Sequence, residues 1–339
     1  KGLFHRVIGQ SGANFGPIGE STEIGDTVQA LDAAERSGLM LAERLGARSL
    51  VELRSRSVHE IQMARLDDGL PPGPGYDPNA MLRGRGAFDT GNPVIDGYVL
   101  PDTARALFAA GAHHDVPLLT GTTSHEQGFT VRPPATLAGM AEYARELLRN
   151  GAARYLDLYP AASDAEAQDT SGYANGDRLF TWQNFYWARE QALRGECPAF
   201  LYRFSHEPPM PQGKSYLENP GRASRAYHGA EIPYAFGTLA STEIPYQPDD
   251  LRLAEQVTSY WANFIRNGDP NGAGLPDWSA FDPATPEAMF LEPCPRMAAL
   301  PNLARILFWD AFYATQTTSL EAYRAARGRY FGKAKSDPC

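Results

Sequence analysis

The side chains of this sequence best suited to chemistry are a histidine and a glutamate in two separate segments. His228 lies in RAYHGAEIPYAFG, a glycine- and aromatic-rich segment at residues 225–237, and Glu126 lies in TGTTSHEQG at residues 120–128. Imidazole is the side chain best suited to act as a general base near neutral pH, and a carboxylate can hold it in the correct tautomer. The two segments therefore predict a general base and its supporting acid for acyl transfer.

A plainer interpretation stays open for each residue. A single histidine in a loop is often only a solvated side chain, and so is a glutamate that follows a strand. His125 is a rival base because it stands beside Glu126. Since adjacent side chains project in different directions, we expect His125 to be a poor partner for Glu126 and to lie at the surface.

The nucleophile that such a pair would serve does not appear in its usual sequence pattern. In α/β-hydrolases the acid and the histidine follow a serine in a Gly-x-Ser-x-Gly turn between a strand and a helix. The 339 residues contain no such turn. Ser11 fails the pattern because Ala13 stands at the second glycine, and Asn14–Pro17 break a helix at once. We expect the Ser11 hydroxyl to support the carboxylate instead.

The elements that must position these residues alternate between strands and helices. Apolar runs predict strands at 6–9, 116–121, 199–204 and 288–291. Apolar residues at helical spacing, with capping residues, predict helices at 28–45, 101–110, 251–267 and 302–315. Residues 68–92 are rich in glycine and proline, which predicts a loop. Continuous apolar strands are typical of a parallel sheet that is buried on both faces, so the pattern predicts an α/β domain.

A helical stretch at 134–195 interrupts this alternation between the Glu126 and His228 segments, with helices expected at 137–150, 164–168 and 176–193. An insertion at this place is suited to form a cap over an active site. Its aromatic residues, Phe185 among them, have the spacing of core packing, but outward-facing members could line a substrate gorge. Tyr227 and Phe236 flank His228 and carry the same two possibilities.

Composition and charge exclude several other classes of protein. Hydrophobic residues make up 43% and charged residues 21%, which is typical of a soluble globular protein. The net charge of −9, without a basic cluster, argues against nucleic acid and anionic membranes as partners. No apolar run is long enough for a membrane span. The three cysteines lack metal-ligand spacing, and we favour free, buried thiols. His113, His114 and Asp115 are consecutive, and neighbouring residues rarely bind one ion together, so we expect no metal.

Taken together, these segments resemble the type-B carboxylesterases, the family that also contains the cholinesterases and the bacterial para-nitrobenzyl esterases. The resemblance covers almost the whole chain, because its motifs occur in the family's order and spacing. They are KGLFHRVIGQSGA at 1–13, VIDGYVLP…DVPLLTGTTSHEQG at 94–128, AFLYRFSHEP at 199–208, HGAEIPYAFG at 228–237, and YWANFIRNGDPN at 260–271 with Trp278 after it.

The resemblance implies an α/β-hydrolase fold with a helical cap and no cofactor. It implies that Glu126 is the triad acid, that His228 is the general base, and that Ser11 supports this pair through a hydrogen bond. It places the nucleophile about fifteen to twenty residues before Lys1, with the oxyanion hole farther upstream. Residues 1–339 would then be the C-terminal part of a single domain. Where many relatives have a disulfide, this chain has Ala47 and Glu52, so that bridge cannot form.

Two functions of different classes follow from these observations. The first is a serine hydrolase of small-molecule carboxylic esters, in which an N-terminal part of the same protein, as a separate fragment or a longer chain, is the partner that supplies the nucleophile. The alternative is a catalytically inactive relative that serves as a binding or adhesion module. Retention of both Glu126 and His228 favours the enzyme. The resemblance favours a secreted or periplasmic location over a cytoplasmic one.

Overall fold

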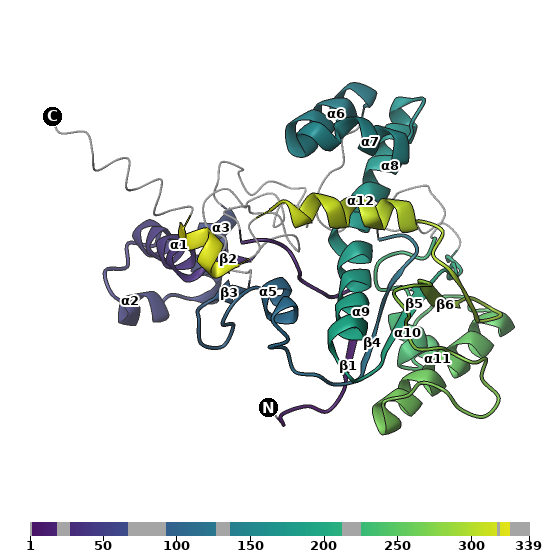
Figure 1. Ribbon diagram of the computed structural model, residues 1–339. Coiled ribbons are helices and arrows are strands. Elements are labelled where there is room, and N and C mark those ends of the chain that lie inside the picture. The colour runs from purple at the N-terminus through teal and green to yellow at the C-terminus, as the bar shows by residue number, and fades with distance from the viewer. Residues whose placement is uncertain are drawn as a thin grey trace. The chain divides into compact units, whose positions relative to one another are not determined.

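The computed structural model describes residues 2–18, 28–66, 93–126, 136–211, 225–316 and 319–325. Contacts divide the chain into two compact units, Lys1–Ala13 with Phe108–Thr315, and Asn14–Leu107 with Gln316–Cys339 (Figure 1). The expected membership of residues 1–339 in one domain stays a prediction. The loop expected at 68–92 lies outside the described residues.

The first unit is built on a sheet of five strands in the order β1-β4-β5-β6-β7. β1, β4, β5 and β6 are parallel neighbours, and β7 pairs antiparallel with β6. The strands are β1 (Val7–Gln10), β4 (Leu118–Thr123), β5 (Ala199–Phe204), β6 (Glu287–Leu291) and β7 (Arg296–Ala299). This mostly parallel sheet with its helices confirms the predicted α/β class. Because parallel strands end at the same edge, residues that follow β1, β4 and β5 are brought near one another.

Helices α9 (Trp182–Arg194) and α11 (Pro248–Asn267) pack on opposite faces of this sheet. The Thr120 hydroxyl of β4 donates to the Asn184 side chain of α9. Its neighbour Leu119 belongs to the apolar core that contains the buried face of α11. Successive side chains of a strand point to opposite faces, so the two helices sandwich the sheet. The amphipathic helix expected at 251–267 is confirmed, and it begins three residues earlier, at Pro248.

Between residue 136 and β5 the chain is largely helical, as expected. It contains α6 (Leu137–Tyr143), α7 (Ala152–Leu158), α8 (Asp164–Gly176) and a π-helical turn, η3 (Asp177–Thr181), which leads directly into α9. The later helix α12 (Leu303–Ala314) packs against α7, η3 and α9. Figure 1 shows α6, α7 and α8 gathered above α12, while α9 descends beside the strands. Their role as a cap over a substrate stays a prediction.

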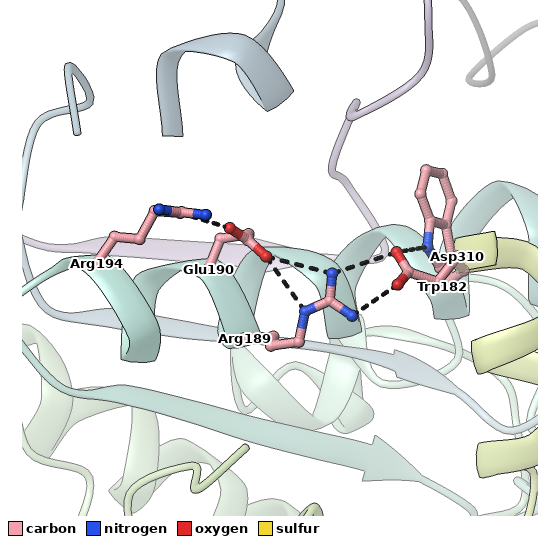
Figure 2. Close-up of polar contacts among 5 residues, drawn as sticks. All are labelled: Trp182, Arg189, Glu190, Arg194 and Asp310. Carbon is pink, nitrogen blue, oxygen red and sulfur yellow. Dashed lines mark hydrogen bonds and ion pairs between the residues drawn. The ribbon is translucent and has the colours of Figure 1, made fainter. Parts of the chain in front are cut away.

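A network of ion pairs fastens α9 to α12. Arg189 of α9 donates to both carboxylate oxygens of Asp310 on α12, with N···O distances of 2.8 and 3.2 Å (Figure 2). The Trp182 indole also donates to Asp310, and Glu190 accepts from Arg189 and Arg194. A two-point contact between a guanidinium and a carboxylate fixes orientation as well as distance. The network therefore holds the two helices in one register.

The second unit has a smaller core. Short parallel strands β2 (Gln29–Ala30) and β3 (Val94–Ile95) pair with each other. The helices described in this unit include α1 (Leu31–Arg44), α2 (Leu50–Arg54), α3 (Val58–Leu66) and the start of α5 (Ala104–Ala109). The helix expected at 28–45 begins later, at Leu31, because the residues before it pair with β3.

Several expectations about single residues and segments can be compared with this fold. Cys197 and Cys294 are free thiols, as expected, but Cys197 is only partly buried and Cys294 is exposed, so the expectation that they are buried is wrong for both. Cys339 lies outside the described residues. Among the described residues, no helix has the length and apolar character needed to cross a bilayer. The same part of the chain contains no group of His, Cys, Asp and Glu side chains arranged as a metal site.

Candidate active site

Glu126 is held at the carboxyl end of β4 by two hydrogen bonds to one oxygen. Its Oε1 accepts from the backbone N–H of Thr123 at 2.7 Å and from the Ser11 hydroxyl at 2.6 Å. Ser11 follows β1, the strand next to β4, and its backbone has a φ of 47°. The Glu126 side chain is almost fully buried. The sheet edge thus fixes the carboxylate from two neighbouring strands and leaves its second oxygen for another donor.

His228 is that donor. Its Nδ1 lies 2.5 Å from Oε2 of Glu126. A short parallel bridge between His125 and Tyr227, with the His125 N–H donating to the Ala226 carbonyl, holds the two segments side by side. Gly229 then turns the chain away with a φ of 84°, a conformation that favours glycine. The structure therefore brings together the three residues that the sequence singled out as acid, base and support.

The geometry of this contact suits general base catalysis. A carboxylate that accepts a hydrogen bond from Nδ1–H fixes the tautomer whose Nε2 carries the lone pair. The His228 side chain is 24% exposed, whereas that of Glu126 is 1% exposed. A partly exposed imidazole on a buried carboxylate can accept a proton from a third group. The carboxylate then stabilises the imidazolium at short range.

Glu231 is a second buried acid at this site, and reasoning from the sequence missed it. It is 1% exposed, and its Oε1 accepts from the Gln10 amide and the Tyr202 hydroxyl, both at 3.3 Å. Burial, followed by the negative charge of Glu126, raises the pKa of Glu231 to about 7. The only signal in the sequence was its place three residues after His228. Neighbouring residues at the end of β1, Gln10 and Ser11, thus contact the two acids separately.

The structure corrects the expectation for His125. This residue was expected at the surface, but it is only 5% exposed. Its ring meets Tyr173 edge-on at a centroid distance of 4.6 Å, and its Nδ1 lies 3.4 Å from a guanidinium nitrogen of Arg225. Arg225 also contacts the Tyr173 hydroxyl and Asp169. The adjacent side chains of His125 and Glu126 do have different partners, but the direction taken by His125 is packed and not solvated.

The three residues suggested for a substrate gorge lie in different environments. Phe185 is 3% exposed and meets Phe281 edge-on at 5.6 Å, as a core residue does. Tyr227 is partly buried and packs against the core around α11. Phe236 follows the short helix α10 (Ile232–Ala235) and is 71% exposed. A role for any of them in contact with substrate stays a prediction.

Comparison with known proteins adds independent information about this arrangement. The sequence profile of the carboxylesterase family matches residues 1–309. The chain is 26% identical to the human (Homo sapiens) cocaine esterase over 95% of the chain and 55% of that protein. It is 27% identical to the acylcarnitine hydrolase of Rattus norvegicus over 91% of the chain and 53% of that protein. It is 28% identical to the pyrethroid hydrolase Ces2e of the same species over 83% of the chain and 47% of that protein.

The chain spans about half the length of the curated relatives it matches. Its mostly parallel sheet agrees with the α/β-hydrolase fold of the matching family. The match covers most of the residues, and it includes the segments that carry Ser11, Glu126 and His228. This chain belongs to the carboxylesterase family and has its α/β-hydrolase fold.

Proposed function

We propose that this chain carries the general base and the supporting acid of a serine hydrolase of carboxylic esters. His228 is the base and Glu126 is the acid, and a segment upstream of Lys1 supplies the nucleophilic serine and the oxyanion hole. The observation that carries the proposal is the 2.5 Å contact between Nδ1 of the partly exposed His228 and the buried Glu126 carboxylate. Family membership supports the reaction class.

The proposed reaction proceeds by acyl transfer in two stages. The serine oxygen attacks the ester carbonyl while Nε2 of His228 takes the hydroxyl proton, and Glu126 stabilises the imidazolium. The oxyanion collapses, the bond to the alkoxy group breaks, and His228 returns its proton to the departing alcohol. Water then attacks the acyl-enzyme, again giving a proton to His228, and the carboxylic acid leaves as the serine regains its proton.

The proposed substrates are small-molecule esters. The names of the relatives describe hydrolysis of cocaine, acylcarnitines and pyrethroids, compounds that differ in both the acid and the alcohol. For this chain we propose only the feature they share, a carboxylic ester.

The test uses the full-length protein that contains this chain, with a chromogenic nitrophenyl ester and a fluorophosphonate probe for the nucleophilic serine. We expect turnover and labelling in the wild type, and loss of turnover by on the order of a thousandfold in His228→Ala. Near-normal turnover in this variant would contradict the proposal. A wild-type protein that folds but neither turns over the ester nor takes the label would support the alternative, an inactive binding or adhesion module.

A further inference from the structure

We propose that Phe180 is a positioning residue for His228, whose ring stabilises the imidazolium that forms when His228 accepts a proton. Phe180 lies in the π-helical turn η3, far from His228 in the sequence. The inference rests on the proposed role of His228 as general base. It concerns a side chain that contributes no proton, charge or hydrogen bond of its own.

The contact itself is an aromatic one. The ring centroids of Phe180 and His228 are 4.7 Å apart, and their planes are inclined by 39°. A cation within about 6 Å of an aromatic centroid is attracted by the negative face of the ring, and more strongly where water is partly excluded. Both side chains are only partly exposed. The contact therefore gains strength when His228 becomes charged, which is the moment at which catalysis needs it.

The helical segment that leads into the turn carrying Phe180 also packs against Glu126, the other member of the pair. Gly176, the last residue of α8, packs so closely on Glu126 that a Cβ atom at 176 would lie 3.0 Å from the Cβ of Glu126 and 3.1 Å from its carbonyl. Residues four apart lie on nearly the same side of a helix. One helical segment thus contacts the acid through position 176 and the base through position 180. Single π-helical turns are rare and occur frequently at functional sites.

The turn is anchored on both sides, so the ring has a defined place. Asp177, the first residue of η3, is buried and accepts from the Tyr159 hydroxyl at 2.9 Å and from the Asn302 amide at 2.8 Å. The Trp309 indole donates to Tyr159 in turn. On the other side, α9 is held to α12 by the Arg189–Asp310 pair. These contacts keep Phe180 against the imidazole before a proton is transferred, so little reorganisation is needed.

The charged groups around His228 come from several elements, and a substitution at 180 leaves all of them in place. Glu126 follows β4 and contacts Nδ1. Glu231, just before α10, interacts electrostatically with both His228 and Glu126. Arg203 on β5 and Asp177 on η3 interact with each other, and Arg203 also with Glu126. A change in the pH profile of a Phe180 variant therefore reports the ring contact and not a lost charge.

Two variants separate the aromatic contact from simple packing. Phe180→Leu keeps an apolar side chain but removes the ring, and Phe180→Tyr keeps the ring. We expect Phe180→Leu to lower the plateau of kcat/KM about three- to tenfold. We also expect the acid limb of its pH profile to move to lower pH, because the protonated imidazole loses a favourable contact. Phe180→Tyr should retain both the plateau and the position of the limb.

The measurement is kcat/KM against pH for the full-length wild type, both Phe180 variants and His228→Ala, with thermal unfolding as a check of the fold. Phe180→Met serves as a second variant without a ring if the leucine variant does not fold. An unchanged acid limb in a folded variant without a ring would overturn the inference, as would equal behaviour of the leucine and tyrosine variants. Normal turnover by His228→Ala would instead reject the proposed function, so the two failures are distinguishable.

Discussion

Two histidine–carboxylate pairs in the first unit have nearly equal N···O distances, but their surroundings differ. The pair at the candidate site joins His228 Nδ1 to Glu126 at 2.5 Å. The other joins Nε2 of His206, which follows β5, to Asp250 at 2.6 Å. Both follow parallel strands of the same sheet, so distance and position alone would make each of them a candidate for catalysis.

The surroundings of Asp250 show that the second pair is structural. Asp250 accepts from the Tyr234 hydroxyl at 2.6 Å and from the backbone of Gln247 at 2.7 Å, and with Gln247 it forms the capping box of α11. Its oxygens are committed to holding a helix end. Its histidine also binds through Nε2, the nitrogen that the candidate site leaves to accept a proton. Two features therefore distinguish a histidine suited to act as a general base from one in a structural contact. They are the ring nitrogen that binds the carboxylate and the other hydrogen-bond partners of that carboxylate.

The largest expected effect separates the two histidines by activity. His228→Ala should lose ester turnover by on the order of a thousandfold, whereas His206→Ala should keep it within about threefold, because in the proposed reaction only His228 exchanges a proton with the nucleophile. Steady-state kinetics on the full-length protein measure both. A comparable loss in the two variants would remove the distinction.

The second prediction concerns stability, for which the pair of His206 and Asp250 should matter. Asp250→Ala should lower the free energy of unfolding by about 2–4 kcal/mol, since it uncaps α11 and leaves the Tyr234 hydroxyl without its acceptor. Urea unfolding measures the loss. Asp249→Ala is a matched control on the exposed side of the same helix turn. Equal losses in the free energy of unfolding for the two aspartate variants would contradict a stabilising role for the Asp250 hydrogen bonds.

The buried Glu231 should make the free energy of unfolding depend on pH. Its pKa rises from 4.5 to about 7 on folding, so the native state binds a proton that the unfolded state releases. The resulting loss in the free energy of unfolding is absent below about pH 4.5 and grows to about 3 kcal/mol as the pH rises through 7. Glu231→Gln should remove this fall in stability. The check is the free energy of unfolding at several pH values, and parallel curves for the two proteins would contradict the assignment.

The smallest effect tests the support of Glu126. Ser11→Ala removes the 2.6 Å hydrogen bond but leaves the Thr123 N–H in place, so kcat/KM should fall about three- to tenfold. Ser11→Gly removes the same hydroxyl and suits the positive φ at this position better. We therefore expect equal kinetics but a higher melting temperature for the glycine variant. A kinetic difference between them would show that the backbone, not the hydroxyl, matters.

Much of the sheet could be predicted because its strands are continuous apolar runs. The strand expected at 199–204 has those bounds, and the helix on its far face shows its periodicity plainly. β7 was missed because RMAA is short and lacks the β-branched and aromatic side chains that favour a strand, and it pairs only with β6. The helix at 28–45 was placed too early because pairing with β3 overrides helical propensity at its first residues.

The residues of the candidate site also differ in how well the sequence could place them. Glu126 and His228 could be placed because each stands at a recognisable segment and the sheet edge brings such segments together. The burial of Glu231 and the contact between the Phe180 and His228 rings could not be predicted, because both depend on residues brought together from distant parts of the chain. His125 was misplaced for that reason too, because its partners, Tyr173 and Arg225, lie far away in the sequence.

The end of β1 sets a limit on how this protein can evolve. Gln10 serves Glu231 and its neighbour Ser11 serves Glu126, and the strand is in register with β4 through Gln10 and Gly121. Gain or loss of one codon within β1 would shift the strand by one residue, which inverts the facing of every side chain. The amide and the hydroxyl would then lose their own acids while the backbone ladder survived. Insertions and deletions should accumulate elsewhere in this gene and spare this strand.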